Sequence, residues 1–377
     1  MSTPTTGARY YELDSIRGIA AIIVLLFHCY QLLGLPEGIK NVIAATPLRL
    51  LISGHQSVIL FFLLSGFVLS LPFNREKKPG YSVYVLKRVC RIYIPYLVAV
   101  AVGFAARTLF NAGAVPGLWN NPVDGKVILQ HVLLVGEFNQ NYFDPVIWSL
   151  VHEMRISLVF PVLVYVMNRF GWKVSLPATL LLSFTGMVLL RYHSSVDYFT
   201  NHFDTLHYAG IFILGALTAK YKPVLLQLLE RSRMKHVLLV LAFGMYLYGA
   251  EYAAAYGIFG SRIGDLAVAC CGILFMLFIF SSPTLTSVLR CRPLQFAGQL
   301  SYSLYLYHLI IILALVNRMG HWNGAALLLL TLLLSVLAAV LGYHLVEKPS
   351  IRLGAYLTAP RHAAPAAVQP DGGRPSS

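Results

Sequence analysis

The first long apolar stretch of the sequence carries ionisable side chains along one face. In LDSIRGIAAIIVLLFH, Arg17 and His28 are eleven residues apart, so on a helix they differ by about 20° around the axis and about 16 Å along it. Asp14 is close to the same stripe. A titratable side chain deep in a bilayer is costly unless it lines a polar cavity. The chemistry that fits is proton transfer, because a neutral imidazole can act as a general base.

A structural interpretation of this pair stays open. Arg17 could extend toward lipid headgroups, and His28 could join two helices by hydrogen bonds. The case for a functional cavity therefore depends on what the other apolar segments carry.

A second apolar segment, IWSLVHEMRISLVFP, is rich in polar residues. It contains His152, Glu153 and Arg155, and Ser149 stands one turn before Glu153. Helix packing does not account for so many charges in lipid, so this segment predicts a polar cavity.

Two further segments carry weaker signals. In GQLSYSLYLYHLIII, Ser301, Tyr305 and His308 share a helix face. Tyr and Ser often join helices, however, and His308 could be structural. In FFLLSGFVLS, Ser65 and Gly66 favour either close helix packing or the approach of the backbone to a ligand.

A basic cluster begins the segment YVLKRVCRIYIPY. Lys87, Arg88 and Arg91 form a compact patch that suits phosphate groups. The alternative is that they are ordinary basic residues flanking the cytoplasmic end of a span.

Several familiar motifs are missing. The sequence contains no GxxxxGK[ST], GxGxxG, GxSxG or HExxH, and no histidine is followed five positions later by aspartate. The five cysteines form no CxxC pair, and we expect them to be small apolar side chains. We therefore expect no metal site, no permanently bound cofactor and no nucleotide hydrolysis.

The composition places these residues in a membrane protein. The chain is 57% hydrophobic and 12% charged, with a mean hydropathy of +0.68. Soluble domains carry about twice that charged fraction. The net charge of +14 could suggest nucleic acid, but basic loops that face anionic lipid explain it better. We expect membrane lipid, and no nucleic acid, among the partners.

Ten segments are apolar and long enough to cross a bilayer as helices. They are residues 16–35, 52–72, 92–110, 146–167, 174–191, 203–219, 237–257, 263–280, 299–319 and 324–346. Residues 126–136 are too short to span and predict an interfacial or re-entrant helix. The predicted fold is all-α, a polytopic membrane helix bundle of about ten transmembrane helices.

The basic residues orient this bundle. Threading ten spans from a cytoplasmic N-terminus puts about three quarters of the Lys and Arg residues on one side, so we expect both termini to be cytoplasmic. The N-terminus lacks the features of a cleaved signal peptide, so the first span should be retained. We divide the chain into a cytoplasmic segment (1–12), a transmembrane domain (13–357) and a disordered cytoplasmic tail (358–377).

Six motifs together resemble the acyltransferase 3 family of integral membrane acyltransferases. The spacing of Arg17 and His28 is similar to the signature of that family's first helix. The similarity continues in family order through FFLLSGF, KRVCRIYIPY, WSLVHEMRISLVFP, SYSLYLYH and VEKP, over about residues 10–350.

The resemblance implies transfer of an acyl group, most often acetyl, from cytoplasmic acyl-CoA to a hydroxyl of a surface polysaccharide or other glycan, in a bacterial cell membrane. His28 would be the general base. Lys87, Arg88 and Arg91 would hold the CoA phosphates, with Arg17 at the mouth of the site or at the oxyanion.

Other residues have less specific expected roles. Glu153 would orient His28 or bind the acceptor. Residues expected to line the cavity are Asp14, Ser65, Ser149, His152, Arg155, Tyr305 and His308. An acyl-histidine relay is a second possible route.

The main alternative function is a secondary transporter or exporter whose intramembrane charges relay protons or bind substrate. The sequence shows neither of the features that such proteins favour, inverted repeats and paired broken helices. A non-catalytic scaffold would not need the charges.

Overall fold

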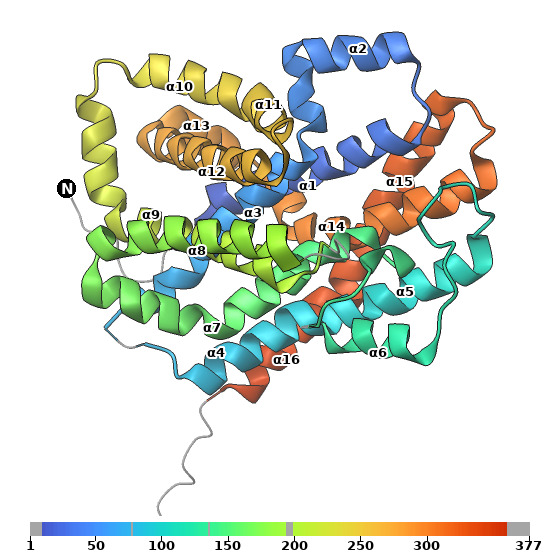
Figure 1. Ribbon diagram of the computed structural model, residues 1–377, viewed down its shortest axis with the longest axis horizontal. Helices are drawn as coiled ribbons and strands as arrows, with labels where there is room; N and C mark the ends of the chain where they lie inside the picture. The colour runs from blue at the N-terminus through green and yellow to red at the C-terminus, as the bar shows by residue number, and fades with distance from the viewer. Residues whose placement is uncertain (1–9, 77, 135, 194–198, 360–377) are drawn as a thin grey trace, which may run out of the picture.

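A computed structural model describes residues 10–76, 78–134, 136–193 and 199–359. These residues form a bundle of helices without strands, as predicted (Figure 1). The α-helices are α1 (Tyr11–Leu32), α2 (Glu37–Ala45), α3 (Gly54–Ser70), α4 (Tyr81–Arg88), α5 (Ile94–Phe110), α6 (Gly125–Leu133), α7 (Trp148–Phe170), α8 (Trp172–His193), α9 (His202–Arg231), α10 (Lys235–Gly244), α11 (Ala250–Ala254), α12 (Gly257–Ser281), α13 (Pro283–Leu289), α14 (Arg292–Met319), α15 (Gly324–Gly342) and α16 (Lys348–Leu357). The segments 1–9 and 360–377, most of the two predicted terminal regions, lie outside the described residues.

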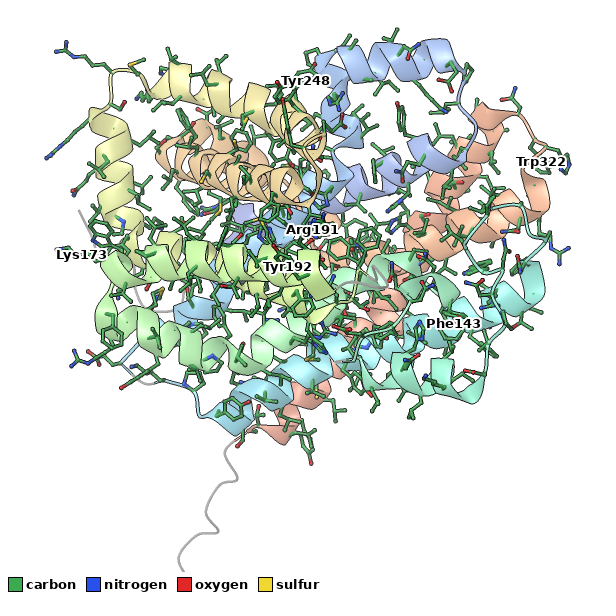
Figure 2. All side chains as sticks on the ribbon, viewed as in Figure 1. Phe143, Lys173, Arg191, Tyr192, Tyr248 and Trp322 are labelled. Carbon is green, nitrogen blue, oxygen red and sulfur yellow. The ribbon has the colours of Figure 1, made fainter. Side chains whose placement is uncertain are left out.

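Ten helical stretches among the described residues are long and apolar enough to span a membrane, which confirms the predicted number. They are Tyr11–Leu32, Gly54–Asn74, Tyr81–Phe110, Pro145–Phe170, Trp172–Tyr192, His202–Arg231, Lys235–Ala254, Gly257–Ser281, Arg292–Met319 and Gly324–Leu357. Several are longer than predicted, because amphipathic ends such as α4 and α16 continue an apolar helix past its hydrophobic part. Lys173, at the start of α8, and Trp322, between α14 and α15, lie at opposite edges of the bundle, and the charge pattern puts these two helix ends on opposite sides (Figure 2).

Glycines allow the central helices to approach closely. A Cβ atom on Gly18 of α1 would lie 2.5 Å from the backbone nitrogen of Gly298 in α14. Between α3 and α9, a Cβ atom on Gly66 would overlap the carbonyl oxygen of Phe212. Small residues at such crossings bring helix backbones together in membranes. The close-packing interpretation of Gly66 is therefore confirmed.

A π-helical turn interrupts the third span. It covers Val89–Tyr93, between α4 and α5, and Arg91 lies within it. Single π-helical turns often accompany functional sites, since they change the direction in which neighbouring side chains point. Two similar turns cover Met245–Gly249 and Tyr343–Glu347.

The short helix α6, nine residues long, packs beside α5 (Figure 1). The hydroxyl of Tyr96 donates to the carbonyl oxygen of His131 at 2.7 Å, and that of Tyr93 donates to the carbonyl oxygen of Val132 at 2.6 Å. The helix is too short to span a membrane, as predicted.

Candidate active site

Two adjoining cavities lie inside the bundle. The first, here called the arginine cavity, has a volume of about 80 Å³. Its polar lining residues are Arg17, Ser65, Arg88, Arg91, Ser149, Glu153, Ser301, Tyr302 and Tyr305. Residues from α1, α3, α7 and α14 and from the interrupted third span thus meet at one point, although they are far apart in sequence.

The arginine cavity carries excess positive charge. Three arginines line it, and Glu153 is its one acidic lining residue. Glu153 Oε1 lies 3.5 Å from Arg88 Nη1 and accepts a hydrogen bond from the Ser65 hydroxyl at 3.4 Å. Within the lining itself, three guanidinium groups face one carboxylate, and such a surface suits an anionic ligand.

Glu153 contacts Arg88 and Ser65 in the arginine cavity. It does not line the second cavity, into which His28 opens, so the geometry pairs Glu153 with Arg88 and not with His28. Lys87 is exposed and lies outside the lining of both cavities.

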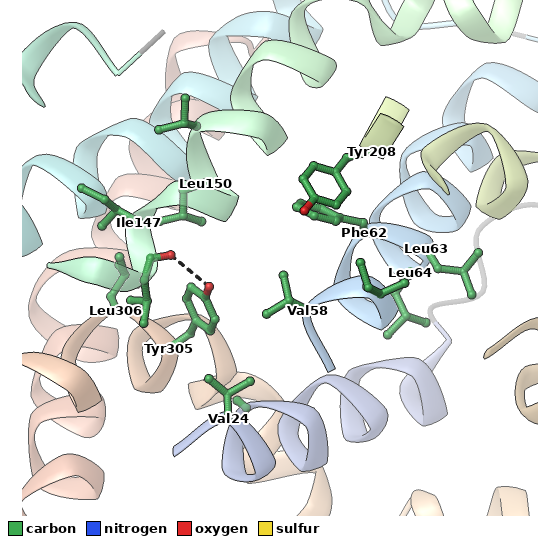
Figure 3. Close-up of a cluster of buried hydrophobic side chains, with 14 of the residues drawn as sticks. Val24, Val58, Phe62, Leu63, Leu64, Ile147, Leu150, Tyr208, Tyr305 and Leu306 are labelled. Carbon is green, nitrogen blue, oxygen red and sulfur yellow. Dashed lines mark hydrogen bonds between the residues drawn. The ribbon is translucent and has the colours of Figure 1, made fainter. Parts of the chain in front are cut away.

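The second cavity, here called the histidine cavity, has a volume of about 580 Å³. Its polar and aromatic lining residues include Phe27, His28, Gln31, His55, Gln56, Gln140, Asn141, Trp148, Phe199, Tyr208, Glu251, Arg262, Asp265 and Tyr305. Val58 and Tyr305 line both cavities. Figure 3 shows Val24, Val58 and Tyr305 converging from three helices.

Arg17 and His28 therefore open into different cavities that adjoin. The sequence predicts that they follow one stripe, and the structure adds a boundary between them at Val58 and Tyr305. The Tyr305 hydroxyl donates to the carbonyl oxygen of Val146 at 3.0 Å and accepts from the Ser149 hydroxyl at 2.8 Å. These bonds fix the aromatic ring at the boundary.

A second imidazole lies beside His28. The ring centroid of His308 is 5.3 Å from that of His28, and the ring centroid of Phe27 is 5.1 Å from it. His308 Nδ1 donates to the carbonyl oxygens of Tyr305 at 2.8 Å and Leu304 at 3.0 Å. His308 is fully buried and lines neither cavity. The His308 ring therefore packs against the His28 ring on the side away from the cavity.

Two other predicted residues hold the backbone in place. His152 Nε2 donates to the carbonyl oxygen of Phe199 at 2.8 Å. Arg155 donates to the carbonyl oxygens of Asn201 at 3.1 Å and Gly136 at 2.7 Å. The structure does not bring His152 or Arg155 into the lining of either cavity, because both side chains are used to join loops to α7.

Asp14 also lies outside both linings. A Cβ atom on Gly298 would overlap its carbonyl oxygen, so this part of α1 packs directly against α14.

The sequence interpretation missed a polar network in the histidine cavity. Asp265 Oδ1 accepts a hydrogen bond from His55 Nε2 at 2.6 Å, and Arg262 binds Asp204 at 2.6 Å and Asp265 at 3.4 Å. His207 Nε2 lies 3.3 Å from Asp265. The signal was present, since Asp265 is an acidic residue within an apolar span.

A multi-pass bundle that encloses arginines and histidines around two adjoining cavities has the construction of a membrane enzyme or transporter. The profile of the acyltransferase 3 family, described as an acyltransferase domain, matches residues 10–344, and the chain belongs to this family. It is therefore a multi-pass membrane acyltransferase.

Two of three similar proteins are named as O-acetyltransferases. The chain is 24% identical over 371 residues to Nodulation protein 10 of Rhizobium leguminosarum, covering 92% of this chain and 95% of the relative. It is 22% identical to "Putative peptidoglycan O-acetyltransferase YrhL" of Bacillus subtilis, covering 78% of this chain and 50% of the relative. It is 21% identical to O-acetyltransferase OatA of Staphylococcus aureus, covering 91% of this chain and 57% of the relative.

The chain thus spans about half the length of the two relatives named as O-acetyltransferases. No solved structure was found to be similar.

Proposed function

We propose that the protein is an O-acyltransferase of a bacterial cell membrane that moves an acetyl group from acetyl-CoA to a hydroxyl group of a glycan. The observation that carries the proposal is the pair of adjoining cavities, one lined by three arginines and one by His28. The names of two relatives, which describe O-acetyltransferases, support the choice of acetyl and of a hydroxyl acceptor.

The donor would enter from the arginine cavity. Its volume of about 80 Å³ is far below the roughly 300–1,000 Å³ of sites that enclose a whole ligand, so it has room for only the narrow thioester end. Exposed Arg91 and Lys87 would hold the phosphates outside, while the part-buried Arg88 and Arg17 attract the anion inward.

His28 would act at the meeting point of donor and acceptor. Its imidazole takes the proton of the acceptor hydroxyl while that oxygen attacks the thioester carbonyl carbon. The new C–O bond forms, the C–S bond breaks, and the CoA thiolate receives the proton back. An acyl-histidine intermediate is the second route, with His28 as nucleophile.

The proposal places the arginine cavity on the cytoplasmic side, where acyl-CoA is found, and the histidine cavity toward the outer side. The positive-inside distribution supports this orientation, because Arg88 and Arg91 belong to the basic side.

Acetyl-CoA cleavage by purified protein in lipid nanodiscs tests the function. Wild type and His28→Ala are supplied with a glycan extract of the host cell, and free thiol and labelled product are measured. The matched control is His321→Ala, since His321 is an exposed histidine outside both cavities.

We expect cleavage that needs both glycan and His28 and is unchanged in His321→Ala. Full activity of His28→Ala would overturn the role of His28. Absence of any acetyl-CoA binding or cleavage by the wild type, with substrate transport by sealed vesicles in its place, would overturn the enzyme itself.

A further inference from the structure

The polar network of the histidine cavity contains a histidine that the proposed reaction does not use. His55, at the start of α3, donates from Nε2 to Asp265 Oδ1 of α12 at 2.6 Å. Asp265 is 1% exposed, whereas the His55 side chain is 38% exposed and lines the cavity. The second ring nitrogen, Nδ1, has no partner among the described residues. Asp265 therefore fixes His55 through Nε2, and Nδ1 is available to a ligand in the histidine cavity.

The charges around Asp265 favour a protonated His55. Two buried carboxylates, Asp204 and Asp265, face one guanidinium, that of Arg262, at 2.6 Å and 3.4 Å. An unpaired buried carboxylate is costly, so this arrangement favours a second cation beside Asp265. His207 Nε2 lies 3.3 Å from Asp265 without hydrogen-bond geometry, while His55 makes a short hydrogen bond. A protonated His55 would direct an N–H donor into the cavity.

The cavity around His55 suits an uncharged ring with many hydroxyl groups. Its volume of about 580 Å³ is within the usual range for a bound small molecule. Trp148 and Tyr208 offer aromatic faces to the C–H faces of such a ring, and Gln31 and Gln56 offer hydrogen bonds to its hydroxyls.

With a protonated His55, the full charges around this cavity balance. Arg262 binds the two aspartates, and Glu251 forms an ion pair with Arg49. The lining therefore has no spare full charge to attract a strongly charged ligand, and His55 contributes a hydrogen-bond donor whose charge is offset by Asp265.

We propose that the histidine cavity is the acceptor site for a neutral sugar ring, and that His55, held by Asp265, is a positioning residue that selects which hydroxyl is presented to His28. This inference rests on the proposed acetyl transfer. Among the described residues, no group of three or more His, Cys, Asp or Glu side chains could hold a metal ion.

The test compares His55→Phe and His55→Gln with wild type and with His321→Gln, all as full chains in nanodiscs. The probes are oligosaccharides from a mild hydrolysate of the host's surface polysaccharide, separated by anion exchange into a neutral and an acidic fraction. The measured quantities are the apparent KM for each fraction, the KM for acetyl-CoA, and the acetylated position, determined by NMR.

We expect the neutral fraction to be acetylated. His55→Phe, which keeps ring volume without nitrogen, should raise the apparent KM for that fraction by about tenfold or more and spread acetylation over several hydroxyls. His55→Gln can still donate a hydrogen bond to Asp265 and contact the ligand. Its apparent KM for the neutral fraction should therefore lie between that of His55→Phe and that of wild type. The KM for acetyl-CoA should change less than about twofold, since the donor uses the other cavity.

Three outcomes would overturn the inference while leaving acetyl transfer intact. They are acetylation of the acidic fraction alone, an unchanged KM for the neutral fraction in both variants, and an unchanged acetylated position in His55→Phe. Failure of the wild type to cleave acetyl-CoA with either fraction would instead overturn the proposed function. A variant that unfolds is recognised by its melting temperature, and His55→Gln then carries the comparison.

Discussion

The hydroxyls of Ser149 and Tyr305 are 2.8 Å apart, joining α7 to α14 where the two cavities meet. Tyr305 also donates to the carbonyl oxygen of Val146 at 3.0 Å. Both residues line the arginine cavity, and Tyr305 lines the histidine cavity as well. A donor that passes from one cavity to the other must move along this ring.

Removing either hydroxyl should have coupled effects. Tyr305→Phe and Ser149→Ala should each lower stability by about 1 kcal/mol, because each removes a buried hydrogen bond. The double variant should lose less than the sum, since the two residues share one bond. Melting temperatures in one detergent provide the measurement. Strictly additive losses would show that the Ser149–Tyr305 bond is energetically unimportant.

Gly66→Ala should be strongly destabilising. The added Cβ atom would overlap the backbone of Phe212, which cannot move without separating α3 from α9. We expect a cost of about 1–3 kcal/mol, the usual range for overpacking. Gly244→Ala is the matched control, because a Cβ atom there meets nothing within 4 Å. Equal melting temperatures of the two variants would contradict the close crossing of α3 and α9.

Arg88 and Lys87 should contribute unequally to donor binding. Arg88 lies inside the arginine cavity next to Glu153, whereas Lys87 is exposed. Arg88→Gln should raise the KM for acetyl-CoA by about tenfold or more, because it removes a part-buried cation and leaves Glu153 without that partner. Lys87→Gln should change it by less than about threefold, and added salt should reduce even that effect. Equal effects of the two substitutions would argue that the phosphates bind outside the cavity alone.

His131 should make stability depend on pH. The residue lies in α6, outside the candidate spans, and burial lowers the pKa of its imidazole to about 4 from an ordinary value of 6.5. Because the unfolded chain binds the proton more strongly, stability should fall as the pH decreases from about 6.5 to about 4 and then level off.

His131→Phe should remove that part of the pH dependence. A phenyl ring keeps the contacts with Phe138 and Phe143, whose centroids lie 4.4 Å and 4.5 Å from the imidazole. The measurement is the melting temperature between about pH 4 and pH 7 for wild type and variant. Parallel curves would show that His131 is not the titrating group.

Hydropathy alone predicted the membrane class, the ten spans and the short helix α6. This is possible because an apolar stretch of sufficient length has few stable alternatives to a helix in lipid. The intramembrane charges also indicated much of the arginine cavity, since Arg17, Arg88, Arg91 and Glu153 all line it. A buried charge needs a partner or a ligand, and that requirement can be read from the sequence.

Only the tertiary structure determined which charged side chains contact one another. His152 and Arg155 have the same sequence signal as Glu153, yet they bind loop carbonyl oxygens and line neither cavity. His55 and Asp265 are 210 positions apart, and nothing local to either residue indicates the other. Helix periodicity determines the face of a helix on which a side chain lies. Which other helix packs against that face depends on close crossings such as Gly66 against Phe212, and these join segments that are distant in sequence.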